Sequence, residues 1–171
     1  MTSYLSNQKI TTTITLSSQN LQHSLIHALY DHLKKKVEGK CNDFGYVVKD
    51  TIQIVKKSVP KVVYLDNSSF LTYKIDYTCD IVQPSIGDEI LFCVENKTDA
   101  GVISYVKYKD IHSKYKKDNE LSDSPIVCII PLDRFQNPEA IVKKQKIKVK
   151  INVVRIKFNN DNIWTVGTPI E

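Results

Sequence analysis

The longest regular pattern in this sequence is the alternation of apolar and polar residues over positions 69–82. One set of alternate positions is apolar: Leu71, Tyr73, Ile75, Tyr77, Cys79 and Ile81. The intervening positions are polar or charged: Thr72, Lys74, Asp76, Thr78 and Asp80. Because successive side chains of a strand point to opposite faces, the pattern predicts a long strand with one buried face. Burial on one face only is typical of an antiparallel sheet.

The residues before this strand predict three further strands and one helix. Residues 9–16 alternate in the same way, and residues 45–55 and 61–65 also indicate strands. Apolar side chains recur at every fourth residue within positions 19–37, which predicts a helix with one apolar stripe. Together these elements predict an α+β layer in which a single main helix covers an antiparallel sheet.

The predicted helix has suitable residues at both ends. Ser17 or Ser18 can accept hydrogen bonds from the first turn as an N-cap. Gly39 suits the left-handed conformation that often follows a helix. His23, His27 and Asp31 fall four residues apart on this helix, a spacing that can hold a metal ion. No third strong ligand accompanies the two histidines, and we expect neither a metal site nor another cofactor.

The segment at residues 83–88 marks a domain boundary, because its proline and glycine interrupt the strand pattern. We therefore predict an N-terminal domain over residues 1–83 and a C-terminal domain over residues 84–171. The second domain contains five strand-like segments, at residues 89–96, 101–108, 126–130, 147–158 and 163–167. Five short strands with little helix predict a five-stranded OB-type β-barrel. The polar loop at residues 109–124 is expected to be mobile and too hydrophilic to pack.

The charge and cysteine content narrow the class of protein. The 171 residues carry a formal net charge of +5, and 22 of the 24 basic residues are Lys, the exceptions being Arg134 and Arg155. This balance indicates a polyanionic partner that is contacted through its phosphates rather than through specific bases. The four cysteines form no CxxC pair, which argues against a zinc ribbon. The first eight residues are polar and no long apolar run follows, so we expect an intracellular protein without a membrane span.

Three lysines near the C-terminus form the strongest basic feature. Lys146, Lys148 and Lys150 project from one face of a predicted strand whose other face is aliphatic. Arg155 and Lys157 fall on the inward parity of that strand, so a β-bulge is expected near Val153 or Val154. The lysines are interpreted either as a ridge that tracks RNA phosphates or as an ordinary solvated strand face.

Aromatic and basic residues are interleaved at the end of another predicted strand. Tyr105 and Lys107 share the parity opposite to the buried one, and they are predicted to contact RNA on the same barrel surface as the lysines. Tyr108 shares the parity of Val102 and Val106 and is expected to lie in the core. We find no nucleophile elbow, no Walker loop and no GxGxxG, so we expect no catalytic activity.

A short motif after the predicted helix adds a family resemblance. Val37-Glu38-Gly39-Lys40-Cys41 is followed by Phe44-Gly45-Tyr46-Val47, and this order resembles the stalk subunit of multi-subunit DNA-directed RNA polymerases, the archaeal and eukaryotic seventh-subunit family. The C-terminal strands around Asn159-Asn160-Asp161-Asn162 and Val166-Gly167-Thr168 are similar to the same family. The resemblance covers about 150 residues, and a copy from a large DNA virus would fit the Lys-rich and Asn-rich composition.

The resemblance implies a truncated ferredoxin-like tip domain that docks on the polymerase core, followed by an OB barrel that contacts nascent single-stranded RNA. The implied docking residues are Glu38, Gly39, Lys40, Cys41, Asn42, Asp43, Phe44, Gly45 and Tyr46. A non-catalytic role in transcription is implied, in partnership with the core subunits and a second stalk subunit. The implied location is the nucleus for a cellular protein, or a cytoplasmic virus factory and the virion for a viral one. The alternative is a free-standing RNA-binding OB protein; a nuclease on the same scaffold is the least favoured class.

Overall fold

The computed structural model describes residues 4–18, 24–158 and 160–170. Its contacts divide the chain into two compact units. One consists of residues 7–38 and 47–80 and is called the sheet unit; the other consists of residues 1–6, 39–46 and 81–171 and is called the barrel unit. The long strand therefore ends in the barrel unit, and the segment Gly39–Tyr46 groups with the barrel although it directly follows the helix.

A six-stranded antiparallel sheet carries one main helix. Its elements are β1 (Leu5–Ser17), α1 (Leu25–Val37), β2 (Cys41–Asn42), β3 (Gly45–Val47), β4 (Gln53–Lys57), β5 (Lys61–Leu65) and β6 (Ser68–Val82). The strand order is β1-β6-β3-β2, and β4 and β5 also pair with β6. The predicted alternation of β6 is confirmed, because its buried side chains include Tyr73, Ile75, Tyr77 and Cys79.

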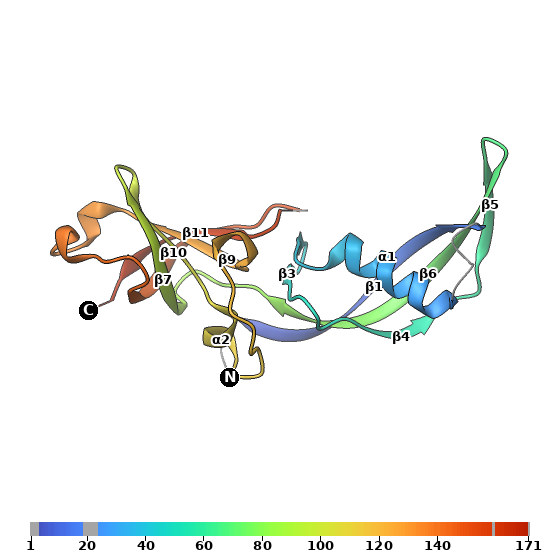
Figure 1. The fold of residues 1–171 in the computed structure, drawn as a ribbon, viewed down its shortest axis with the longest axis horizontal. Helices are drawn as coiled ribbons and strands as arrows, with labels where there is room; N and C mark the ends of the chain where they lie inside the picture. The colour runs from blue at the N-terminus through green and yellow to red at the C-terminus, as the bar shows by residue number, and fades with distance from the viewer. Residues whose placement is uncertain (1–3, 19–23, 159, 171) are drawn as a thin grey trace. The chain divides into compact units, whose positions relative to one another are not determined.

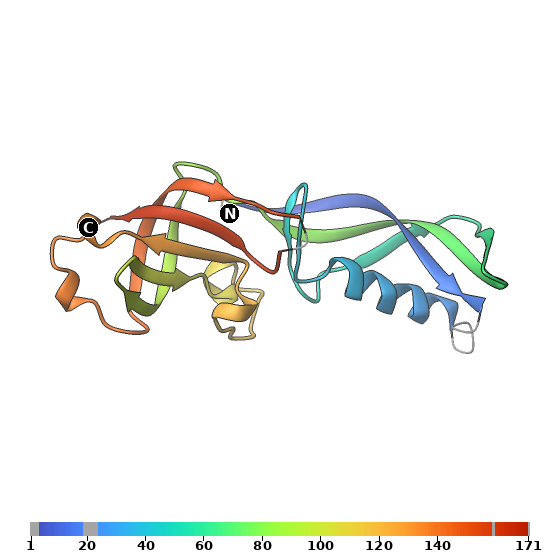
Figure 2. The same ribbon diagram turned by 90° about the horizontal axis from the view of Figure 1, so that it is seen from above.

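The helix α1 covers one face of the sheet unit (Figures 1 and 2). Leu29 and Leu33, one turn apart on its apolar stripe, are both fully buried. Gly39 has a φ of +67°, as expected for the residue after a helix, and the Glu38 amide donates a 2.9 Å hydrogen bond to the Lys34 carbonyl. The predicted first turn, from Gln19 with Leu21 and His23, lies outside the described residues.

The prediction of one strand over residues 45–55 was wrong, because the chain turns between β3 and β4. Asp50 adopts a φ of +60°, a left-handed conformation that Asp tolerates better than most residues. The Thr51 hydroxyl donates a 2.7 Å hydrogen bond to the Val48 carbonyl and closes the turn. A polar Lys49-Asp50-Thr51 sequence between two apolar runs was the signal for this break.

The second part of the chain forms a closed five-stranded barrel (Figure 1). Its strands are β7 (Glu89–Thr98), β8 (Gly101–Tyr105), β9 (Ile126–Ile130), β10 (Lys146–Arg155) and β11 (Ile163–Pro169). The order is β7-β8-β9-β11-β10, closed by pairing of β10 with β7. The pair β9–β11 is parallel and the other pairs are antiparallel. This confirms the predicted OB-type architecture. Short 3-10 helices, η3 (Leu132–Arg134) and η4 (Pro138–Ala140), lie between β9 and β10.

The segment at residues 109–124, expected to be mobile and unpacked, instead packs against the end of β8. It contains most of α2 (Tyr108–Ile111) and the 3-10 helix η2 (Leu121–Asp123). Asn119 accepts a 2.7 Å hydrogen bond from the Tyr108 amide and donates one of 3.2 Å to the Val106 carbonyl. The fully buried Ser124 hydroxyl also bonds to the Val106 backbone. Two polar side chains thus bond to the buried backbone groups of Val106 and Tyr108 and hold the segment in place.

Candidate nucleic-acid interface

The outer face of β10 carries a row of basic side chains. Ile151 and the residues before it alternate regularly, and the pairing register with β11 then shifts between Ile151 and Val153. The expected β-bulge is therefore confirmed, and it turns Arg155 outward together with the lysines that precede it. We call the following exposed side chains the basic row: Lys146, Lys148, Lys150 and Arg155.

Two members of the basic row are already paired with carboxylates. Lys146 Nζ lies 2.6 Å from Asp110 Oδ1, and Lys148 Nζ lies 2.6 Å from Glu89 Oε2. The hydrogen bond and positive charge of Lys148, with a smaller contribution from Lys150, lower the pKa of Glu89. The Lys148–Glu89 pair is exposed on both sides, and surface pairs of this kind are weak, so a phosphate group can replace its carboxylate. Asp110 is more protected, because only 13% of its side chain is exposed.

The neighbouring strand β11 places the only tryptophan of the chain beside this row. Trp164 is 41% exposed and lies directly opposite Arg155 in the β10–β11 pairing. Val166 and Val153 form the next pair, and Ile129 of β9 lies beside Val166. These strands line a cavity of about 410 Å³, whose walls are Ile129, Val153, Arg155, Lys157, Asn160, Trp164, Thr165 and Val166.

The prediction that Tyr105 is an accessible contact residue was wrong, because its side chain is only 5% exposed. The strand register does place it on the expected outer face, since Tyr105 pairs with Cys93, which in turn pairs with Lys146. Burial, followed by the nearby Cys93, Glu95 and Asp118, raises the pKa of Tyr105 to about 12. The tyrosine is therefore a packed, protonated phenol and not a platform for stacking.

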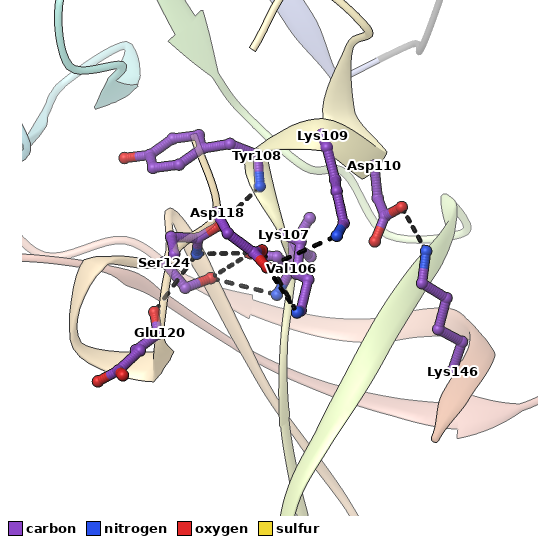
Figure 3. Close-up of polar contacts among 10 residues, drawn as sticks. Val106, Lys107, Tyr108, Lys109, Asp110, Asp118, Glu120, Ser124 and Lys146 are labelled. Carbon is purple, nitrogen blue, oxygen red and sulfur yellow. Dashed lines mark hydrogen bonds and ion pairs between the residues drawn. The ribbon is translucent and has the colours of Figure 1, made fainter. Parts of the chain in front are cut away.

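Lys107 is also placed differently from the prediction, because it faces the segment that returns along β8. Its ammonium group lies 3.3 Å from Asp118, and Lys109 reaches the same carboxylate at 3.6 Å (Figure 3). The hydrogen bond from Lys107 lowers the pKa of Asp118. Tyr108 is buried, as expected from its parity.

The resemblance assigned residues 38–46 to docking. In the structure, the residues at both ends of this motif form contacts within the fold. Glu38 accepts a hydrogen bond from the Asp50 amide and pairs with Lys34 at 3.4 Å. Cys41 is buried, and its amide donates a 2.8 Å hydrogen bond to the Asn160 carbonyl. Burial and the charge of Asp161 raise the pKa of Cys41 to about 11, so its thiol stays protonated at neutral pH.

Gly45 and Tyr46 fix the far end of this hairpin. The Tyr46 hydroxyl forms a buried 2.7 Å hydrogen bond with the Tyr108 hydroxyl, and burial strongly raises the pKa of Tyr46. Gly45 has a φ of +129°, and a Cβ at this position would collide with the Val82 carbonyl oxygen. The side chains that reach solvent are Asp43 and Phe44, the latter 50% exposed, while Lys40 and Asn42 are half-buried.

Two surface features were missed from the sequence. The first is Trp164, whose signal was a lone tryptophan on the outward parity of β11 just after an Asn-rich turn. The second is β5, an edge strand in which every residue is exposed although Val62, Val63, Tyr64 and Leu65 are apolar. The signal there was apolar character at both parities of a strand whose partner covers only one edge.

Within the described ranges, no group of three His, Cys, Asp or Glu side chains is arranged to hold a metal ion, and His23 lies outside those ranges. None of the helices in the described part of the chain is long and apolar enough to cross a membrane. The sequence matches no protein-family model and no curated protein. The function proposed for the chain therefore rests on its barrel fold, its side-chain geometry and its motif resemblance.

Proposed function

We propose that this chain binds single-stranded RNA through the outer face of β10. The observation that carries the proposal is the basic row, four exposed cations on one strand of an OB-type barrel. OB barrels bind oligonucleotides, and positively charged grooves track the backbone of single strands. Lysine supplies most of this charge, which favours sequence-tolerant contact with phosphates over bidentate reading of bases.

Binding would proceed by exchange of carboxylate partners for phosphate. Lys148 would leave Glu89, and Lys146 would leave Asp110, as phosphate groups approach the row. Each such contact releases a condensed counterion from the nucleic acid, so affinity should fall steeply with salt. Because the surface presents point charges, all sequences should be bound to a similar extent.

We further propose, on the strength of the motif resemblance, that the chain is a non-catalytic subunit of a DNA-directed RNA polymerase. The hairpin at residues 39–46 supports a docking role, because its ends are fixed by Tyr46 and Cys41 while Asp43 and Phe44 remain exposed. Small exposed loops on a rigid base are where recognition is commonly located. The partners would be the polymerase core and a second stalk subunit, and the RNA would be the nascent transcript.

The RNA proposal is tested by fluorescence anisotropy with a labelled oligonucleotide over a salt series. Changing Lys146, Lys148 and Lys150 to Gln should reduce the magnitude of the log–log salt slope by about 2, at about 0.7 per lost phosphate contact. The matched control changes three exposed lysines of the sheet unit, Lys56, Lys61 and Lys74, to Gln. Equal slopes for the two triple variants would contradict binding on β10.

A further inference from the structure

The cavity at the end of the β10–β11 pair has a composition that the basic row alone does not explain. Three of its lining residues, Ile129, Val153 and Val166, are apolar and are neighbours across three strands. Trp164 also lines the cavity, and its side chain is half-exposed. A large aromatic ring left open to solvent beside aliphatic side chains is suited to cover a second flat, apolar ring.

The polar wall of the same cavity is cationic. Arg155 and Lys157 both line it, and Arg155 is the cross-strand neighbour of Trp164. Across the described residues, neither cation forms an ion pair, whereas Lys146 and Lys148 of the basic row do. An anionic group entering the cavity would therefore meet two cations without displacing a carboxylate.

The remaining polar residues that line the cavity are Thr165 and Asn160. Thr165 is buried and its hydroxyl donates a 3.0 Å hydrogen bond to the Val127 carbonyl, so it belongs to the wall. The Asn160 carbonyl accepts the Cys41 amide at 2.8 Å, which anchors the β10–β11 connection at the rim. Asn160 also lines the cavity, and an amide side chain can both donate and accept hydrogen bonds.

We infer that this cavity is a subsite for one unpaired nucleotide, with the base against Trp164 and the phosphate on Arg155 and Lys157. A volume of about 410 Å³ lies in the range of small-ligand sites and admits one nucleotide. Stacking on an aromatic side chain accepts any base, since every base has a flat π-face. This inference rests on the proposed RNA binding and deepens it, because it adds a base-holding anchor to a surface that otherwise contacts only phosphates.

Trp164 is the only tryptophan, so its fluorescence reports on this cavity alone. The full chain is titrated with uridine 5′-monophosphate, with uridine and with ribose 5-phosphate. The nucleotide should quench the emission at the lowest concentration, the nucleoside should quench more weakly, and the sugar phosphate should leave the emission unchanged. Arg155→Gln should weaken the nucleotide several-fold and leave the nucleoside unaffected. The matched control is Arg134→Gln, which changes the other arginine of the chain, outside the cavity.

A second variant set separates this subsite from the basic row. Trp164→Leu should lower the affinity for a labelled RNA on the order of tenfold without changing its salt slope, and Trp164→Phe should restore most of that affinity. If RNA binds through the basic row but uridine monophosphate leaves the fluorescence unchanged and Trp164→Leu binds normally, the subsite is wrong and the proposed function stands. If the nucleotide quenches in an Arg155-dependent way while no oligonucleotide binds, the subsite stands and the proposed function is wrong. Equal effects of the Arg155 and Arg134 variants on the nucleotide would also overturn the inference.

Discussion

Single carboxylates set how much of the positive charge on β10 can reach a ligand. Glu89 lies opposite Lys150 in the β7–β10 pairing and forms a 2.6 Å ion pair with Lys148. One carboxylate therefore lies close to two lysines of the basic row. Lys148 lowers the pKa of Glu89 and so favours its ionised form. Asp110 forms a 2.6 Å ion pair with Lys146. An RNA phosphate that binds these lysines must therefore displace the paired carboxylates as well as the water that solvates the lysines.

Glu89→Gln should raise the affinity for single-stranded RNA a few-fold at low salt, because it releases Lys148 without changing the shape of the side chain. The effect should shrink as salt screens the exposed charges. Anisotropy titrations at two salt concentrations measure both trends. The matched control is Glu139→Gln, which breaks the exposed 2.9 Å pair with Lys97 near η4. Equal affinities of the two variants would show that Glu89 does not compete with RNA.

At the scale of elements, the alternation of apolar and polar residues within one strand could be predicted from the sequence. Burial of a strand by other segments of the chain could not. The buried face of β6 and the bulge of β10 followed from parity, because both are properties of one strand. The parity of Tyr105 was also right, yet parity did not indicate that its side chain is only 5% exposed, with Asp118 of the segment at residues 109–124 nearby. That segment packs through Asn119 and Ser124, which both bond to the backbone of Val106, directly after β8. The cavity at Trp164 could not be predicted from the sequence, because its lining depends on the pairing register of three strands.

The hydrogen bond between Tyr46 and Tyr108 should hold the β2–β3 hairpin against α2 of the barrel unit. Tyr46→Phe should lower the free energy of unfolding by about 1 kcal/mol, the usual net contribution of one such bond. Urea unfolding of this variant, of Tyr108→Phe and of the double variant gives the coupling energy between the two hydroxyls. A coupling energy of zero would contradict a role for the bond in fixing the hairpin.

The same pair predicts the direction of the alkaline pH dependence. Burial raises the pKa of Tyr46 in the folded protein, so the folded state disfavours the phenolate. The free energy of unfolding should therefore be constant below the unfolded pKa of about 10 and fall as the pH rises above it. Tyr46→Phe should reduce that fall, and a variant that loses stability as steeply as the wild type would argue against this tyrosine as its source.

At the scale of the whole molecule, we assign docking to the hairpin at residues 39–46 and RNA binding to the basic face of the barrel. Changing Lys40, Asn42, Asp43 and Phe44 together should leave the protein folded, because the fixed contacts of Cys41 and Tyr46 are retained. The same variant should fail to co-purify with polymerase from the native source. A control that changes the exposed Val62 and Tyr64 of β5 tests whether any surface substitution has this effect. Normal incorporation of the folded quadruple variant would refute docking through the hairpin.

The central claim, that single-stranded RNA lies on the outer face of β10 and β11, is tested most directly by photo-crosslinking. RNA carrying 4-thiouridine is crosslinked to the full chain, and the attached peptides are identified by mass spectrometry. Crosslinks are expected within residues 146–166, including the peptide that contains Trp164, and they should be lost when Lys146, Lys148 and Lys150 are changed to Gln. Crosslinks confined to residues 53–74 of the sheet unit, or unchanged by the triple substitution, would contradict it.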